Sequence, residues 1–321
     1  MQADSKRGDD KPDATRRAGG PAVTAPAEPS VTFALVDVFA DRPLSGNPLA
    51  VVPDADWLDI EQMRRIAREL NQVETTFLLA PSRADADRRL RSFTAAGAEV
   101  EGAGHNALGA WLWLAATGAL DHEIVSTWSQ QIGGDVLAVE ITRDGDQDIV
   151  VTMDQSAPRF APALVDRRPL LSALGLDEQD LDPTLPTQVV DTGAGHLLIA
   201  VANPGVLDRI VVDQHALGEV LRLAGGEGCY VYAAPPNSDD VQAYARFFNP
   251  TMGIVEDPAT GTAAGPLAAA LVRHGRVQPG DVVIVQGQAI GRPSRLRVHV
   301  AGDRVRLSGS GIVSGRGTLR V

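Results

Sequence analysis

Cysteine is nearly absent from this sequence, and its scarcity excludes several kinds of site. Cys229 is the single cysteine among 321 residues, so one chain can form neither a disulfide framework nor a zinc site built from cysteines. The residue lies in the apolar run 228–232, which is typical of a buried strand, and we interpret it as a small core residue. The six histidines are scattered along the chain, and we expect no metal site.

Aromatic residues and positive charge are also scarce. Aromatic side chains make up 4% of the sequence, so small aliphatic side chains must fill most of the core. Acidic residues outnumber lysine and arginine by 41 to 29, which gives a formal net charge of −12 at pH 7. Nucleic-acid binding needs a basic surface, so we expect no nucleic-acid partner. A small carboxylate ligand is compatible with this charge, because backbone N–H groups can act locally.

The sequence has no long apolar run either. The longest, 107–120, is too short to cross a membrane and is interrupted by glycine, so we expect no membrane partner. Residues 1–30 are rich in Asp, Arg, Ala, Gly and Pro and contain no apolar stretch. They predict a disordered tail rather than a secretory signal or a packed element. These patterns together predict a soluble, cytoplasmic protein.

Two segments far apart in the sequence share one design. The segment 102–110, GAGHNALGA, precedes an apolar helix predicted at about 106–117, and the segment 256–265, EDPATGTAAG, precedes one at about 261–274. Each combines glycine with a polar side chain and so leaves unpaired backbone N–H groups at the positive end of a helix dipole, where an anion can bind. Since the design occurs twice, we expect two halves that face each other across one site.

Short strands are expected on either side of both helices. Alternating and β-branched runs predict strands at 31–39, 47–52, 74–79, 90–94, 124–129, 136–142, 149–154, 189–190, 197–201, 230–233, 242–248, 282–286, 294–300, 304–308 and 318–321. Two further helices are predicted at 58–70 and 214–223. Asp144-Gly145-Asp146 and Ala301-Gly302-Asp303 are the expected turns of two hairpins.

Both glycine-opened helices are apolar nearly all round, which indicates burial on every side. We therefore predict an α+β fold of two pseudo-symmetric domains, 31–155 and 156–321, each with mostly antiparallel strands around a central helix. The proline-rich stretch 156–169 is the predicted linker. Whether the final strand returns to the first half is left open.

Polar residues at these positions could supply chemistry. Burial of Glu74 between a helix and a strand would raise its pKa toward the range used in proton transfer, although a solvated or capping glutamate is the simpler interpretation. His105 could bind a substrate or move a proton near neutral pH, or could cap the helix. A helix cap also accounts for Asp257 or Thr260. No function follows from any of them alone.

Several motifs together resemble those of the PhzF-like isomerases. They are NPLAVV at 47–52, RIARELN at 65–71 followed by ETTF at 74–77, Gly104-His105, RFFNP at 246–250 and GIVEDPATGTA at 253–263. The Glu-Asp-Pro-Ala-Thr-Gly segment is the most specific of them. The resemblance extends over nearly all of 31–321.

The resemblance implies the diaminopimelate-epimerase fold, with two β-barrel-like halves that each wrap a central helix. It also implies that Glu74 is the acid/base, which takes a proton from the ring of trans-2,3-dihydro-3-hydroxyanthranilate and returns one elsewhere. The product would be a reactive ketone precursor of phenazines. Such a reaction needs no cofactor, and family relatives are often dimers, so a homodimer is implied.

The resemblance assigns further residues to a small carboxylate substrate. His105 and Asp257 would join Glu74 in the catalytic set by binding and polarising the substrate. The backbone at Gly104, Gly261 and Thr262 would hold the carboxylate. Asn106 is the fourth predicted substrate-binding residue.

The sequence departs from the family pattern at three places. Thr262 stands where serine is common, Asn106 replaces a smaller residue, and the segment 95–102 lacks the usual proline. These changes bear on the shape of the substrate more than on the chemistry. Epimerases of the same fold use one cysteine from each half, and neither glycine-rich segment here contains a thiol, so a two-thiol racemase is excluded.

Two alternatives stay open. The first is an epimerase or related proton-transfer enzyme that acts on an acyclic amino acid in the same cleft. The second is a non-catalytic protein that binds a small carboxylate and retains the fold, although that alternative leaves Glu74 without a use.

Overall fold

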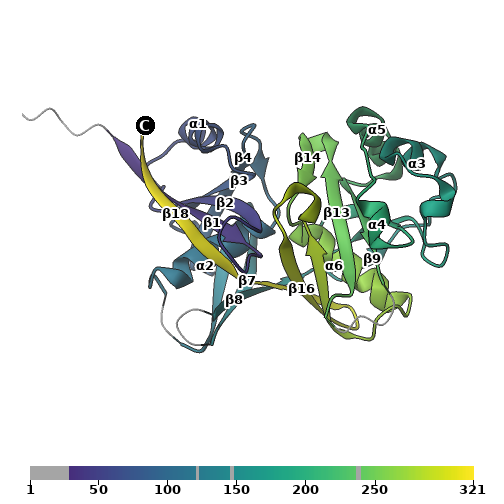
Figure 1. The fold of residues 1–321 in the computed structure, drawn as a ribbon. Coiled ribbons are helices and arrows are strands. Elements are labelled where there is room, and N and C mark those ends of the chain that lie inside the picture. The colour runs from purple at the N-terminus through teal and green to yellow at the C-terminus, as the bar shows by residue number, and fades with distance from the viewer. Residues whose placement is uncertain (1–28, 121–122, 145–147, 236–239) are drawn as a thin grey trace, which may run out of the picture.

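The computed structural model describes residues 29–120, 123–144, 148–235 and 240–321, and Figure 1 shows them as two lobes side by side. The predicted tail at 1–30 lies outside the described residues except for its last two positions. The hairpin turn predicted at 144–146 likewise lies outside them beyond its first residue. Among the described residues, no helix is both long enough and apolar enough to cross a membrane.

Among its described residues, the N-terminal lobe alternates short strands with two helices. In chain order its elements are β1 (Ser30–Val38), β2 (Asn47–Val52), α1 (Ile60–Leu70), β3 (Glu74–Leu79), β4 (Arg88–Thr94), β5 (Glu99–Val100), α2 (His105–Ala116), β6 (Val125–Ile132), β7 (Asp135–Asp144) and β8 (Asp148–Gln155). Strand β2 pairs antiparallel with β1 and parallel with β3, and β4 pairs antiparallel with β3 and parallel with β6. Strands β6, β7 and β8 continue as an antiparallel meander.

The C-terminal lobe repeats this order with several additions. Its elements are β9 (Arg159–Phe160), α3 (Arg168–Leu174), β10 (Gln188–Asp191), β11 (Gly195–Ala200), α4 (Pro204–Leu207), α5 (Gln214–Ala224), β12 (Gly228–Ala233), β13 (Ala243–Asn249), β14 (Ile254–Asp257), α6 (Gly261–Arg273), β15 (Gly280–Gln286), β16 (Ser294–Ala301), β17 (Arg304–Gly309) and β18 (Gly311–Arg320). Short 3-10 helices lie at Glu178–Asp180, Pro250–Met252 and Gln288–Ile290. Strands β10 to β17 pair in the same sequence as β1 to β8.

The strands of both lobes form one mixed sheet. Within the described residues, eighteen strands are connected, with β8 and β17 paired antiparallel where the two series meet. The last strand, β18, pairs antiparallel with β1, and in Figure 1 it crosses the N-terminal lobe in yellow. The series of described pairings ends at β18 and β9, so the sheet is open. The predicted α+β class is confirmed, whereas the predicted barrel-like halves are not, because the sheet of the described residues is not closed.

Most strand pairs of the described residues are antiparallel, as predicted, but four of them are parallel. They are β2–β3, β4–β6, β11–β12 and β13–β15. A helix separates the two partners along the chain in each case: α1, α2, α4 with α5, or α6. A crossover of this length can return the chain to the starting edge, which a two-residue hairpin cannot do.

The two glycine-opened helices lie in the core, as their composition predicts. In α2, Leu108 and Trp111 are fully buried, and Leu267 and Leu271 are fully buried in α6. Glycine permits the close packing: a Cβ added to Gly109 would lie 2.6 Å from side-chain atoms of both Leu49 and Val38. Cys229 in β12 is fully buried, in agreement with the predicted core position.

Part of the predicted linker is structured. Strand β9 pairs with β10, and α3 begins at Arg168. Prolines suggested an irregular segment, but Pro169 stands in the first turn of α3, where proline is favoured because no acceptor is needed for its missing N–H. The buried Leu170 and Leu174 join Leu217 of α5 in a second hydrophobic core. A helix of seven residues is too short to produce a clear periodic signal.

Candidate active site

The N-termini of α2 and α6 meet at the junction of the two lobes. Gly104 precedes α2 and Thr260 precedes α6. A Cβ added to Gly261, the first residue of α6, would lie 3.9 Å from the Cα of Gly104. A cavity of about 130 Å³ opens at this meeting point. All seven residues predicted from the sequence line it, namely Glu74, Gly104, His105, Asn106, Asp257, Gly261 and Thr262.

Helix α6 presents two backbone donors at this cavity. Its first backbone hydrogen bonds are donated by Ala263 and Ala264 to the carbonyl of Thr260, at 3.1 and 3.0 Å. The N–H groups of Gly261 and Thr262 precede these bonds and have no acceptor within the helix. They lie at the positive end of the helix dipole, so they can donate to a carboxylate.

Helix α2 offers its N–H groups one residue later than we expected. The N–H of Gly104 donates to Oδ1 of Asn106 at 2.8 Å, so it is not open to a ligand. The first helical bond runs from Leu108 to the carbonyl of Gly104, so the N–H groups of His105, Asn106 and Ala107 precede it. Of these residues, His105 and Asn106 line the cavity. Their N–H groups, rather than that of Gly104, are the candidates for anion binding.

Asn106 holds the glycine-rich loop in shape. Besides accepting from Gly104, its side-chain amide donates to the carbonyl of Gly102 at 2.9 Å and to Oγ of Ser92 at 3.1 Å. Its side chain is 2% exposed, and its polar groups are taken up by these three bonds. Asn106 therefore contributes to the cavity by fixing its wall and by its backbone N–H.

The start of β3 places Glu74 at the cavity. Helix α1 begins with a capping box between Asp59 and Gln62 and ends at Asn71, which adopts the left-handed conformation with φ of 50°. The chain then enters β3, where Glu74 is aligned between Leu49 of β2 and Thr94 of β4. Two neighbouring strands thus fix the backbone that carries the carboxyl group.

Glu74 and His105 form the central pair of the site. Oε2 of Glu74 lies 4.0 Å from Nε2 of His105, and the two side chains are 13% and 8% exposed. Within the described structure, neither atom has a hydrogen-bond partner. A separation of 4.0 Å is too long for a hydrogen bond, so both atoms are available to a ligand in the cavity.

Burial shifts the two groups in opposite directions. It raises the pKa of Glu74 to about 8, and the neighbouring Asp257 adds to this rise. It lowers the pKa of His105 to about 3, so the imidazole is neutral at physiological pH. A carboxyl group that titrates near neutrality can both accept and donate a proton, and a neutral imidazole can hydrogen-bond to a ligand.

Asp257 is fixed from both lobes. Its Oδ1 accepts a hydrogen bond at 2.9 Å from Nδ2 of Asn47 in β2, and its Oδ2 accepts one at 2.6 Å from Oγ1 of Thr260. Asn47 also donates to the carbonyl of Ala259 at 2.7 Å. Burial raises the pKa of Asp257 to about 7 in spite of these donors. Asn47 therefore ties the first lobe to the entrance of α6.

His196 of β11 also lines the cavity, and sequence reasoning missed it. Its Nε2 lies 3.1 Å from Oγ1 of Thr262, and its side chain is 3% exposed. The two residues are 66 positions apart, so no local spacing connects them. The sole signal was the glycine-rich turn at 193–195 ahead of a predicted strand.

The charge of the cavity wall is acidic. Glu74, Asp257 and Glu227 contribute carboxyl groups, and no lysine or arginine is among the described residues that line it. A bound carboxylate would therefore be held by N–H and hydroxyl donors, and protonation of the nearby carboxyl groups would strengthen its binding. No group of three potential metal ligands occurs among the described residues.

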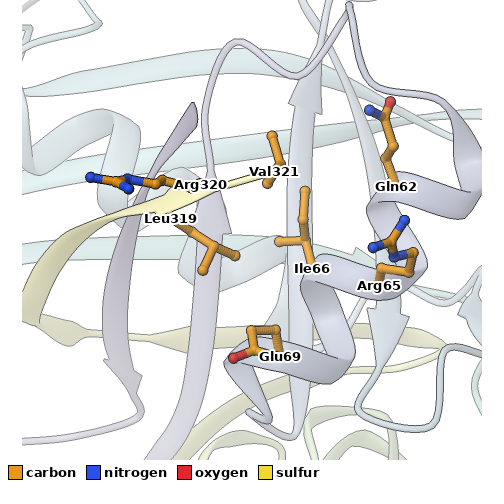
Figure 2. A pocket seen from close by; sticks show the side chains of 7 residues that line it. All are labelled: Gln62, Arg65, Ile66, Glu69, Leu319, Arg320 and Val321. Carbon is orange, nitrogen blue, oxygen red and sulfur yellow. The ribbon is translucent and has the colours of Figure 1, made fainter. Parts of the chain in front are cut away.

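A second hollow lies between α1 and the end of β18, as Figure 2 shows. It is larger, about 260 Å³, and is lined by Gln62, Arg65, Ile66, Glu69, Leu319, Arg320 and Val321. Arg65 and Glu69 are exposed there. None of the described side chains that line it holds a buried polar atom without a partner. The groups suited to proton transfer are thus in the cavity at the helix N-termini.

The fold and the site define an α+β protein whose buried carboxyl and imidazole groups face a small cavity between two helix N-termini. The family model described as phenazine biosynthesis-like protein matches residues 36–317. The chain belongs to this family, as the motifs predicted.

Relatives support the assignment over most of the chain. The chain is 37% identical over 293 residues to trans-2,3-dihydro-3-hydroxyanthranilate isomerase of Pseudomonas chlororaphis, a match that covers 89% of this chain and 98% of the relative. It is 35% identical over 290 residues to the uncharacterized isomerase YddE of Escherichia coli, covering 87% and 94%. The PhzF-family phenazine biosynthesis protein of Bacillus anthracis superposes with a TM-score of 0.83 at 26% identity, covering 91% of this chain and 100% of that one.

Proposed function

We propose that the protein is a cofactor-independent isomerase that moves a proton on a small cyclic amino or hydroxy carboxylic acid. The substrate class is that of trans-2,3-dihydro-3-hydroxyanthranilate, in secondary metabolism. The observation that carries the proposal is the buried carboxyl group of Glu74, with a pKa of about 8 and an unpaired Oε2, beside two opposed helix N-termini. The isomerase name of the relative from Pseudomonas chlororaphis supports it.

The substrate carboxylate binds at the helix N-termini. The N–H groups of Gly261 and Thr262 donate from α6, and those of His105 and Asn106 donate from α2. This arrangement leaves the ring between the carboxylate and Glu74. Asp257 and the imidazole of His105 then hydrogen-bond to the amino and hydroxyl groups of the ring.

The reaction consists of two proton transfers. Glu74 in its carboxylate form removes a proton from a ring carbon, and the electron pair of the broken C–H bond moves into the conjugated ring. The resulting carboxylic acid returns a proton to another carbon of the same ring. Substrate and product are isomers, so no oxidant, reductant or cofactor is consumed.

The proposal also includes the division of the chain into two halves, its oligomeric state and its location. The repeated strand order supports two functional halves, 31–155 and 156–321, with β18 contributed to the first. Each half encloses one central helix in a barrel-like manner without closing the sheet. A homodimer and a cytoplasmic location complete the proposal and rest on the family resemblance and on the sequence patterns.

Incubation with trans-2,3-dihydro-3-hydroxyanthranilate, followed by proton NMR, tests the proposed activity. We expect consumption of the substrate and signals of a ring isomer that carries a ketone. Inversion at a single carbon would identify an epimerase instead. Binding of the substrate without any change in its spectrum would identify a non-catalytic carboxylate binder, and no binding would point to another substrate.

A further inference from the structure

His196 reaches the cavity in a fixed orientation but has no part in the proposed proton transfers. Its ring packs edge-on against Phe247, with centroids 5.1 Å apart and planes at 87°. Phe247 is itself confined by Gly228, because a Cβ there would lie 2.3 Å from the phenylalanine ring. The backbone of His196 is aligned with Gly228 in the β11–β12 pair. The ring is therefore held in place from the strand and from its side.

Thr262, which faces His196, also has a fixed side chain. Its Cγ2 methyl group lies against the α2 loop, where a Cβ on Gly104 would be 3.6 Å away. Its Oγ1 faces Nε2 of His196 at 3.1 Å. Because the methyl group is packed, only the hydroxyl proton of Thr262 can still rotate. Its direction depends on whether Nε2 of His196 donates or accepts the hydrogen bond.

The hydrogen bond between these residues has two possible directions. Burial lowers the pKa of His196 to about 4, so the ring is neutral and carries one N–H. If Nδ1 carried the proton, it would be an unsatisfied buried donor, since it has no partner among the described residues. If Nε2 carries it, the ring donates to Oγ1 of Thr262 and Nδ1 is left as an unpaired acceptor. A buried N–H donor without a partner is rarer in proteins than a buried acceptor without one. Donation from Nε2 of His196 to Oγ1 of Thr262 is therefore favoured.

We propose that His196 is a positioning residue that donates from Nε2 to Thr262 and so turns the threonine O–H into the cavity. The hydroxyl then adds a side-chain donor to the N–H groups of α6 around the carboxylate. A site made of donors alone matches a carboxylate, which only accepts, better than a carboxamide, which must also place its own N–H groups. This inference rests on the proposed function, since it concerns the carboxylate end of the same substrate.

Binding of 3-hydroxyanthranilate and of 3-hydroxyanthranilamide tests the inference without turnover. The acid is the aromatic analogue of the proposed substrate, and the amide differs from it only at the carboxylate. We expect His196→Phe and Thr262→Val each to weaken binding of the acid about tenfold in calorimetric titrations, on the scale of one lost hydrogen bond to a charged group. Binding of the amide should change much less.

The coupling between the two residues is the sharper readout. The double variant should bind the acid no more weakly than either single variant, because both remove the same directed hydroxyl. His196→Gln should restore most of the affinity, since its amide can donate where Nε2 lay. Additive losses, or a His196→Gln variant as weak as His196→Phe, would overturn the inference, as would a wild-type protein that binds acid and amide equally.

Kinetics separate this inference from the proposed function. With trans-2,3-dihydro-3-hydroxyanthranilate, His196→Gln should raise KM by less than His196→Phe does, and kcat should change little in either. If the wild-type protein does not convert this compound but the binding pattern holds, the proposed function fails and the role of His196 stands. Melting temperatures near that of the wild type show that each variant is folded. If His196→Phe does not fold, the comparison of His196→Gln and Thr262→Val with the wild type still tests the inference.

Discussion

Glu74 and His105 respond to burial in opposite directions, and both responses suit proton transfer. Burial and Asp257 raise the pKa of Glu74 to about 8, while burial lowers the pKa of His105 to about 3. At neutral pH, Glu74 therefore exchanges a proton readily, and His105 is a neutral hydrogen-bonding group. In the proposed binding mode the substrate carboxylate needs no positive side chain among the described residues of the wall, because backbone N–H groups and the Thr262 hydroxyl donate to it.

Carboxylate binding should weaken as pH rises. Asp257 and Glu74 have pKa values of about 7 and 8, so both are mainly protonated at pH 6 and ionised at pH 9. Ionisation places negative charge beside the bound carboxylate, and we expect the Kd of 3-hydroxyanthranilate to rise at least about tenfold over this range. Titrations at several pH values measure it. Glu74→Gln should flatten the profile, and an equally steep profile in that variant would contradict the assignment.

The raised pKa of Glu74 should also make the stability of the protein depend on pH. The folded-state pKa of Glu74 lies above its ordinary value of 4.5, so the stability gained by holding this proton is fully present below pH 4.5 and is lost as pH rises through about 8. Glu74→Gln should therefore melt above the wild type at pH 8.5 by several degrees more than at pH 5. Thermal melts at both pH values provide the comparison. Glu61→Gln, at an exposed site on α1, should show no such difference, and the idea fails if both variants behave alike.

At the scale of elements, the close approach of the α2 and α6 N-termini depends on glycine. A Cβ at Gly261 would lie 2.6 Å from Cδ2 of Leu307, closer than packed atoms allow. We expect Gly261→Ala to lower the free energy of unfolding by about 1–3 kcal/mol through overpacking, and to weaken carboxylate binding. Urea unfolding measures the first effect.

Gly218 provides the matched control within helix α5. A Cβ there would meet Pro250 at 3.8 Å, an ordinary contact distance. Gly218→Ala should therefore be neutral or stabilise the protein by up to about 1 kcal/mol, because alanine favours a helix. Equal changes in the free energy of unfolding for the two substitutions would show that steric crowding at Gly261 does not destabilise the protein.

Sequence patterns predicted elements where local chemistry is strong. Helices α1 and α5 carry an Asp cap and a regular apolar face, and they begin within two residues of the predicted positions. Helix α3 and strand β9 were missed because each is short and lies among prolines. Parallel pairing was also missed, since it depends on which distant strand receives the chain after a helix.

At the scale of the whole molecule, contacts across the junction hold the lobes in register. Arg292 forms an ion pair with Asp37 at 2.6 Å and donates to the backbone carbonyls of Ser45 and Gly46. Asp37 is 3% exposed, so the loss of its partner leaves a buried charge. We expect Arg292→Met to lower the free energy of unfolding by about 3–5 kcal/mol, measured by urea unfolding.

Arg168→Met supplies the comparison for this prediction. Arg168 pairs with Asp166 at 2.7 Å, but their side chains are 84% and 51% exposed. Solvent screens such a pair, so its loss should leave the stability nearly unchanged. A small effect at Arg292 that matches the one at Arg168 would mean that the junction does not depend on the buried pair.

The site itself could be predicted in part. The two glycine-rich segments indicated a divided anion site, and their helices do meet at one cavity. The sequence did not predict Asn47 and His196 as site residues, because their partners, Asp257 and Thr262, lie 210 and 66 residues away. No local pattern reports such contacts. The bond between Gly104 and Asn106 was hidden for another reason: a loop can satisfy its own N–H groups in ways that composition does not reveal.

The assignment of Glu74 as the acid/base is tested most directly by hydrogen exchange during turnover. Wild-type protein, Glu74→Gln and Glu74→Asp would be incubated with trans-2,3-dihydro-3-hydroxyanthranilate in heavy water, and the deuterium content of the ring would be read by NMR. We predict a deuteron in the wild-type product, slower incorporation with Glu74→Asp, and almost none with Glu74→Gln while the substrate is still bound. Incorporation by Glu74→Gln at the wild-type rate would contradict the account, because another group would then move the proton.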